Sequence, residues 1–439
     1  MILKNDMDLF SVDQTEGFHS LSAIIHTKTA DINVYRLISF DVISDFVESY
    51  ADRVVLKGMI TQSQWVKDIM QVRTNLEMTV IKRTSMATYV TRYKAVIPDT
   101  VVKEANFDVS SALGHADLDL GGLAMCEIHG KHLFVEVAPL PSFGGTFSNV
   151  TLDAIMSKCI KHYMGQTPLP GGSSLDECIV VPAHNQKAYP QVTIPSGTPL
   201  LRLPSFLQTK YGVYTANIGS YLRPYADGSK VWWIYPLTGG FKWTDNVPKL
   251  SIMLPNDKLD RRGVMLRNTI QREDSTLLIV AHITDVTSPA VDHRPTVRPT
   301  GFKIIDTDRT IETPMDYQHG EVKVGKGDRY KQVEVYSRDD SLPMDIPTPS
   351  VGSNYYVAAS MLSSNTVTPT VVRWENGVNE LLTPGMITQV IYDKTTRGEK
   401  GIGRLTGCHS ICTPVTKSSA TAPLFQETCM LTINLETNQ

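Results

Sequence analysis

The sequence predicts a mainly β, multi-domain protein with short helices, an α+β fold, from three observations. The 25 prolines and 29 glycines are spread along the chain, a distribution typical of many short strands and turns. Several short segments alternate between apolar and polar side chains, as strands with one buried face do. A chain of 439 residues is long enough for two to four domains of about 100–200 residues each.

Residues 1–100 are predicted to form a compact barrel-like domain behind a polar N-terminal arm. The apolar residues of 41–50 have helical spacing, and Thr61 is placed to cap a second short helix that ends near Met70. The remaining apolar segments of this block are predicted strands, at 31–40, 53–60, 76–83 and 88–97.

Three further segments follow. Residues 101–225 are predicted to form an α+β insert domain, with strand character at 124–137 and a helix over 152–164. Residues 226–364 contain strands and an extended polar arm or insertion, which occupies 306–349. Residues 365–439 are β-rich, with alternation at 370–374, 386–392 and 428–435.

The stretch 194–237 is the most informative part of the sequence. Ser205 is a candidate cap for a short helix, and Gly212 is placed to end that helix with a positive φ. Residues 213–221 and 230–235 are predicted strands, joined by a turn centred on Asp227-Gly228.

The second of these strands carries two adjacent tryptophans. Trp232 and Trp233 must face opposite sides of the strand, so one can be core while the other needs a separate cover. That cover is either a packed domain or a second subunit, since Trp and Tyr are enriched at interfaces. The candidate interface residues are Trp232, Trp233, Tyr211, Tyr214 and Tyr221.

Composition excludes several classes of protein. The net charge of −3 provides no basic field for holding nucleic acid. The sequence has no apolar run of about 18 residues and no signal-peptide pattern, so we expect no membrane insertion and assembly in a cytoplasm. The six cysteines, at 126, 159, 178, 408, 412 and 429, lack the spacing of a disulfide framework and are expected to be reduced.

Possible metal sites have ordinary explanations. His129 and His132 lie in a predicted turn where they need not converge, and no Cys or Glu pattern completes a site. A solvated strand face explains the alternation of His115, Asp117 and Asp119. No second Cys or His pair follows Cys408-His409-Ser410-Ile411-Cys412, so we predict no metal site.

Catalytic motifs are also absent from the sequence. Gly171-Gly172-Ser173-Ser174 lacks the glycine spacing of a nucleophile elbow, and residues 398–403 lack the Gly-Lys-Ser/Thr of a phosphate loop. The acid pairs at 306 and 308, and at 339 and 340, show only closeness in sequence rather than convergence in a cleft. We therefore predict no catalytic residues, no cofactor and no enzyme activity.

Two segments carry a resemblance to a known family. The pattern Leu-Pro-Ser-Phe-Leu-Gln…Tyr-Gly-Val-Tyr…Ile-Gly-Ser-Tyr…Trp-Trp-Ile-Tyr-Pro over 194–237 resembles the central baseplate hub of contractile-tailed bacteriophages, and Arg73–Val80 resembles its tube domain. The resemblance implies a homotrimeric structural virion protein that joins the six-fold tail tube to the three-fold central spike. It also implies contacts with baseplate wedge proteins, and transient contact with DNA or the tape measure in the channel during DNA ejection.

In such a trimer each chain supplies two tube-like β-barrel domains, so that three chains present six units to the tube. We expect the first in residues 1–100 and a second in 365–439, assembled partly from 230–290. Two alternatives stay open. One is a tail-associated enzyme that degrades cell wall or polysaccharide, and the other is a tail tube initiator or adaptor.

Overall fold

The computed structural model describes residues 18–47, 49–72, 76–84, 87–98, 123–132, 142–166, 175–225, 229–238, 247–254, 271–273, 276–285, 302–305, 312–314, 332–335, 356–357, 360, 367–392, 399–415 and 424–436. In these ranges strands predominate and the helices are short, which confirms the predicted mainly β, α+β fold class. No helix within them is both long enough and apolar enough to cross a membrane.

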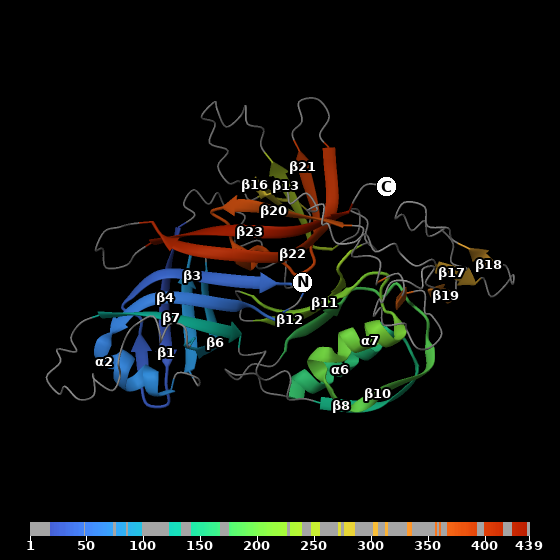
Figure 1. Cartoon of the computed structure of the whole chain (residues 1–439), viewed down its shortest axis with the longest axis horizontal. Helices are drawn as coiled ribbons and strands as arrows, with labels where there is room; N and C mark the ends of the chain where they lie inside the picture. The colour runs from blue at the N-terminus through green and yellow to red at the C-terminus, as the bar shows by residue number, and fades with distance from the viewer. Residues whose placement is uncertain are drawn as a thin grey trace, which may run out of the picture.

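A first closed sheet, here called the N-terminal barrel, is formed near the start of the chain (Figure 1). β1 pairs with β5 along one edge and with β2 along the other, and β2 leads through Val34 and Tyr35 into β3, so the ring closes. Closure leaves these strands without free edges. The strands are β1 (Phe18–His26), β2 (Asp31–Asn33), β3 (Arg36–Asp45), β4 (Arg53–Thr61), β5 (Leu76–Arg83), β6 (Thr88–Val96) and β7 (Leu123–His132).

A short helical segment joins β4 to β5. It runs through α2 (Gln62–Gln64), η1 (Trp65–Ile69) and η2 (Met70–Val72). The Gln64 N–H donates to the Thr61 hydroxyl at 3.4 Å, which confirms Thr61 as the cap. Trp65 and Ile69 are buried and cover one end of the barrel core.

The helix predicted over residues 41–50 is wrong, because β3 continues to Asp45. Val42, Ser44 and Phe46 are buried, and this two-residue period is the one that the structure uses. β4 and β22 pair with β3 on its two edges, so the backbone is satisfied as a strand. The helical spacing of the apolar side chains could not compete with two flanking strands.

Two long strands, the shared hairpin, join this barrel to a second one. β22 (Glu399–Pro414) pairs with β23 (Leu424–Glu436) over most of its length. The C-terminal part of β22 pairs with β3 and the N-terminal part of β23 pairs with β1, so the hairpin enters the wall of the N-terminal barrel. Their other halves pair with β21 and β20.

The second ring, the C-terminal barrel, closes around the same hairpin (Figure 1). β15 pairs in parallel with β13, and the single residue Ala281 leads from β15 into β16, which pairs with β20. β13 also pairs in parallel with β21. The strands added here are β13 (Lys249–Leu254), β15 (Thr276–Val280), β16 (His282–Asp285), β20 (Val367–Glu375) and β21 (Ile387–Tyr392); β14 (Gln271–Glu273) pairs with β15, and η5 (Asn379–Leu381) follows β20.

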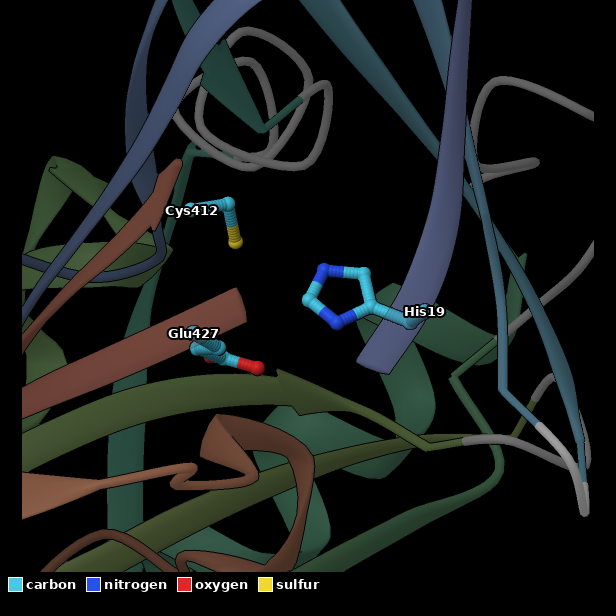
Figure 2. Close-up of side chains that lie close together, drawn as sticks. All are labelled: His19, Cys412 and Glu427. Atoms are coloured by element: carbon cyan, nitrogen blue, oxygen red, sulfur yellow. The ribbon is translucent and has the colours of Figure 1, made fainter. Parts of the chain in front are cut away.

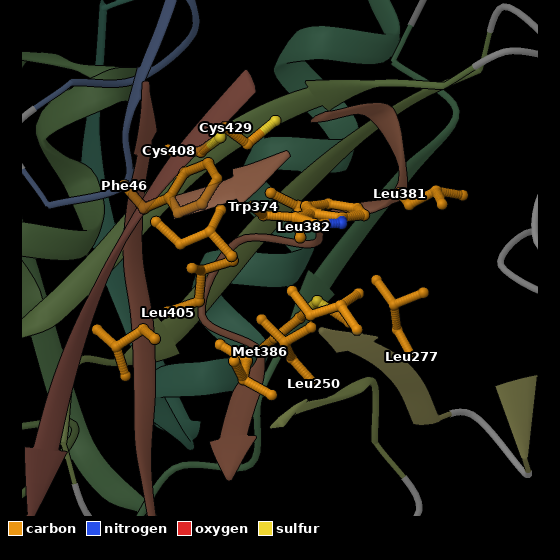
Figure 3. Packing of buried hydrophobic residues seen from close by; sticks show 14 of the residues in the cluster. Phe46, Leu250, Leu277, Trp374, Leu381, Leu382, Met386, Leu405, Cys408 and Cys429 are labelled. Carbon is orange, nitrogen blue, oxygen red and sulfur yellow. The ribbon is translucent and has the colours of Figure 1, made fainter. Parts of the chain in front are cut away.

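The core of the C-terminal barrel is a tight apolar cluster (Figure 3). Trp374 from β20 shares the cluster with Leu381 at the end of η5 and with Leu382 after it, and Phe46 reaches in from the end of β3. Trp233 and Tyr235 belong to the same cluster. The insert therefore contributes directly to this core.

The insert lies between the barrels in sequence and has its own core. β8 pairs with β10, while β12 pairs with β11 and β9. The predicted helix over 152–164 is confirmed as α6, with Leu152, Ile155, Met156 and Ile160 buried. The elements are β8 (Ser142–Val150), α6 (Leu152–Gln166), β9 (Glu177–Val180), β10 (Tyr189–Pro199), η3 (Leu200–Arg202), α7 (Leu203–Tyr211), β11 (Ile218–Pro224) and β12 (Lys230–Pro236).

Helix α7 begins earlier than predicted but ends where predicted. Arg202 rather than Ser205 is its N-cap residue, because Pro204 occupies the first turn and the Ser205 hydroxyl donates to the Arg202 carbonyl at 3.0 Å. Gly212 has φ 67° and its N–H donates to the carbonyls of Leu207 and Gln208. A glycine is needed here because a Cβ would lie 2.5 Å from that of Tyr356.

A small sheet begins just before the polar region 306–349: β17 (Phe302–Ile305) pairs with β18 (Glu312–Pro314) and β19 (Gln332–Val335). Residues 1–17 of the predicted arm 1–18, Asp227-Gly228 and most of 306–349 lie outside the described residues. The predicted domain limits stay predictions.

Candidate functional site

A buried polar network, the interbarrel junction, lies where both barrels and the insert meet. Lys82 on β5 donates to both carboxylate oxygens of Glu380, at 2.8 and 2.9 Å, and to Glu427 Oε2 at 2.5 Å. Burial alone would lower the pKa of Lys82, but the two carboxylates outweigh it and hold this pKa well above its ordinary value. One ammonium therefore links the N-terminal barrel to η5 and to the shared hairpin.

Asn379 continues the network toward the insert. Its backbone N–H donates to Glu427 Oε1 at 3.3 Å. Its carbonyl and side-chain oxygens accept from the Arg223 guanidinium on β11, the side-chain oxygen at 3.2 Å. Arg223 also lies 3.4 Å from Asp52 Oδ1, so buried charges of opposite sign alternate through the junction.

Asp52 is the second carboxylate centre of the junction. Its Oδ1 accepts from the Ser44 hydroxyl at 2.5 Å and from the Tyr221 hydroxyl at 2.6 Å. Burial and the negative charge of Asp52 together raise the pKa of Tyr221 well above its ordinary value, so the phenol stays a donor. Asp52, Tyr221 and Arg223 are all buried, which makes each dependent on the others.

A cavity of about 290 Å³ adjoins the junction. Its walls come from the N-terminal barrel, the insert and η5, and include Lys82, Tyr93, His132, Arg223 and Glu380. Burial lowers the pKa of His132 to about 4, although Asp52 acts in the opposite direction. His132 is therefore neutral at pH 7.

Two further side chains converge with Glu427 beside Lys82, at the seam between β1 and the shared hairpin (Figure 2). One atom each of His19, Cys412 and Glu427 lies within 4.8 Å of the others, and all three residues are buried. Burial, with a smaller contribution from Lys82, lowers the pKa of His19 to about 3, and its Nε2 has no hydrogen-bond partner. Burial and then Glu427 raise the pKa of the Cys412 thiol.

The arrangement holds charges in place rather than exposing them to a substrate. Glu380 and Glu427 both face Lys82, and Asp52 faces Arg223, so each described carboxylate of the junction is tied to a cation. Removal of one partner from such a buried pair is costly, because it leaves an uncompensated charge. The junction therefore favours a structural role, in which it couples the N-terminal barrel, the C-terminal barrel and the insert.

The predicted interface residues fall on both sides of β12 and around it. Trp232 lies in the insert core and its Nε1 donates to Ser220 Oγ at 2.8 Å, whereas Trp233 lies in the core of the C-terminal barrel and donates to the Tyr225 hydroxyl at 3.0 Å. The opposite orientation of the two rings follows from β12 being a strand. Tyr214 and Tyr221 are also buried within the chain.

Tyr211 is the candidate that keeps an accessible surface. Its ring packs at 5.4 Å and 76° against Tyr189, and its hydroxyl accepts from the Thr193 N–H at 3.2 Å. Because four of the five side chains are covered within one chain, a subunit contact at this place would have to use Tyr211. That contact stays a prediction.

His129 and His132 lie on strand β7, so the turn predicted there is wrong: the backbone is paired with β4 and β6. His129 bonds to Glu127 at 2.8 Å and is partly exposed, whereas His132 is buried against Tyr93.

Gly401 and Gly403, from the segment compared with a phosphate loop, belong to strand β22. Other groups considered lie outside the described residues: His115, Asp117, Asp119, 171–174, Gly398 and the acid pairs at 306 and 308 and at 339 and 340.

Sequence reasoning missed Lys82, Glu427 and Asp52, although a signal for the first two exists. Lys82 follows Leu76, Met78 and Val80 on the inward face of its strand. Glu427 likewise stands between Phe425 and Cys429 on the inward face of β23. A charge at an inward position of an alternating strand predicts a buried partner of opposite sign.

Comparison with known proteins yields similarities in structure only. No protein-family model matches the chain, and no curated protein matches it. A tail protein from Neisseria meningitidis MC58 is 13% identical over 94% of this chain and 96% of its own, with a TM-score of 0.42. A 43 kDa tail protein of prophage MuSo2 from Shewanella oneidensis is 10% identical over 94% and 98%, with a TM-score of 0.40. A prophage tail protein from Listeria monocytogenes is 11% identical over 94% of each chain, with a TM-score of 0.36.

Proposed function

We propose that this protein is a structural component of a contractile phage tail, the trimeric baseplate hub that joins the six-fold tail tube to the three-fold central spike. The observation that carries the proposal is the pair of closed sheets that the described residues build within one chain. Three chains arranged around an axis would present six such sheets to the tube. The spike would then meet the same trimer with matching symmetry.

The shared hairpin supports this role physically. Because β22 and β23 belong to both sheets, neither barrel can tilt without disturbing the other. The Lys82 ion pairs add a second link between the barrels. A fixed angle between the two units is what a ring of alternating, near-equivalent barrels requires.

Exposed apolar side chains supply candidate contacts between chains. Phe18, Val415 and Leu424 are each more than a third exposed. They lie near one another, since Ser20 pairs with Leu424 and the Val415 N–H donates to the Leu424 carbonyl at 2.9 Å. Apolar surface of this kind is suited to contact with a second copy or with the tube protein.

The resemblance of 194–237 to the hub family supports the remaining parts of the proposal. These are contacts with the tube, spike and wedge proteins, a position in the virion, and a channel through which DNA or the tape measure passes. A net charge of −3 suits such a channel, because dense Lys and Arg would hold the phosphates.

The first prediction tests the proposal by stoichiometry. We expect mass measurement of the purified protein, alone and with its spike, to give three chains, and electron microscopy of tails to place three copies between tube and spike. A stable monomer inside the particle would overturn the proposal. A ring of six would favour the tube initiator instead, and release of sugars from peptidoglycan by the pure protein would favour the enzyme.

A further inference from the structure

We propose that His19, Cys412 and Glu427 bind one divalent transition-metal ion of the zinc type at the seam between the N-terminal barrel and the shared hairpin (Figure 2). The proposal does not depend on the tail role. It rests on the convergence of three buried ligand types, on an imidazole nitrogen without a partner, and on an unbalanced buried charge.

The donor set matches this class of ion. Thiolate, imidazole and carboxylate together are typical of zinc sites, whereas magnesium and calcium prefer oxygen ligands alone. Bonds of about 2.0–2.3 Å to a tetrahedral ion place ligand atoms about 3.3–3.8 Å apart. The three atoms here lie within 4.8 Å of one another, so small side-chain rotations would complete the site.

His19 provides the second observation that points to a ligand. The side chain is 4% exposed, yet its Nε2 has no hydrogen-bond partner. A buried polar atom left in this way costs free energy, which coordination to a metal would recover. Figure 2 shows the ring extending from β1 toward Cys412 and Glu427.

The charges around the site also favour a cation. Lys82 is shared by Glu380 and Glu427, so this group carries two negative charges against one positive charge. When Glu427 turns to the ion, Lys82 keeps both oxygens of Glu380. The ion's double charge is then matched by Glu427 and the Cys412 thiolate, and the thiol proton passes to solvent as the metal–sulfur bond forms.

Neighbouring groups would orient the ligands. The Ser410 hydroxyl donates to Glu427 Oε1, so Oε2, which accepts from Lys82 in the structure, is the oxygen that would turn to the ion. His19, Cys412 and Glu427 come from β1, β22 and β23 respectively, so the ion would cross-link β1 to the shared hairpin, which lies far from it in sequence. Its role would be to hold the hairpin in the wall of the N-terminal barrel, with water in the fourth position of the ion beside the three protein ligands.

The test uses the full chain, stripped with a chelator and titrated with cobalt(II), whose thiolate bond gives a near-ultraviolet charge-transfer band. We expect one cobalt per chain with this band, and a rise in melting temperature when zinc is added. Cys412→Ser should abolish the band. Cys178→Ser, a matched change at a buried thiol of the insert core, should leave it intact.

His19→Gln keeps the thiolate and should weaken cobalt binding by more than about tenfold, since loss of even an outer partner of a ligand costs about 10- to 100-fold. This variant keeps the test decisive if Cys412→Ser does not fold. Wild-type protein without a thiolate–cobalt band overturns the proposal. So does a band that survives in folded Cys412→Ser or is unchanged in His19→Gln.

Discussion

The two barrels are built in different ways, although they share two strands. In the N-terminal barrel each described pairing among β1–β7 is antiparallel, and most join neighbours in sequence, such as β3 with β4 and β5 with β6. In the C-terminal barrel β13 pairs in parallel with both β15 and β21. Parallel pairs need long connections, so this barrel depends on contacts between segments far apart in the chain.

The hydrophobic cores of the two barrels differ in a similar way, since one is built mostly from its own segment and the other is not. Outside residues 21–128, the core of the N-terminal barrel takes in Cys412 and Phe425, both from the shared hairpin. The core of the C-terminal barrel takes in Tyr221, Trp233 and Tyr235 from the insert as well as Phe46. The first barrel is therefore largely self-contained, whereas the second folds together with the insert. Three predictions test this difference.

The largest effect is expected from breaking the link between the barrels. Lys82→Met leaves Glu427 and Glu380 without their buried cation, and removal of one partner of a buried pair costs about 3–5 kcal/mol of unfolding free energy. Denaturant unfolding should show this loss. We also expect the unfolding transition to broaden, since only the shared hairpin would then couple the two barrels.

Lys57→Met is the matched control, because Lys57 is 46% exposed and pairs with Glu127 at the surface. Its cost should stay below about 1 kcal/mol. The double variant Lys82→Met, Glu427→Gln should recover part of the loss, since it also removes the uncompensated charge. Equal stability of Lys82→Met and Lys57→Met would show that the junction does not couple the barrels.

Comparable losses are expected at the adjacent tryptophans, but in different cores. Trp232→Ala and Trp233→Ala should each lower the unfolding free energy by about 3–5 kcal/mol. Hydrogen exchange should rise in the insert for the first variant, and in both the insert and the C-terminal barrel for the second. The N-terminal barrel should stay protected in both.

Melting at several protein concentrations is the control for these variants. Because both side chains are covered within one chain, the losses should not depend on concentration. A variant that keeps its monomer stability and fails only in assembly would place that tryptophan at a subunit contact.

The smallest effect on stability is expected when the pH is lowered. His132 in the N-terminal barrel has a pKa of about 4, against 6.5 ordinarily, because it is buried; Asp52 opposes this shift and Lys230 adds to it. Between these values the unfolded chain binds the proton and the folded chain does not, so stability falls as pH drops from about 6.5 toward 4. His132→Gln should reduce the slope of this part of the stability profile, measured by denaturant midpoints, while His19, whose pKa burial lowers to about 3, retains its own share of the slope. An unchanged slope would mean that another group causes it.

Some features of the fold could be predicted because they depend on residues close together in the chain. Alternation identified strands such as 53–60 and 230–235, and the helix over 152–164 followed from its apolar face. Thr61 and Gly212 were recognisable because capping acts within one turn. The helix predicted over 41–50 was wrong because β4 and β22 pair with this segment as a strand, whatever the helical spacing of its apolar residues.

The sequence by itself determined the strand-rich class, the caps at Thr61 and Gly212, and the opposite orientation of Trp232 and Trp233, since each follows from residues within a single element. Only the tertiary structure decided that β22 and β23 close two barrels, and that Lys82 meets Glu380 and Glu427. Those contacts span 298 and 345 residues. These contacts depend on which strands pair and in what register. No local pattern specifies either, because the sequence of one strand shows which residues face inward but not which residues of another strand they will meet.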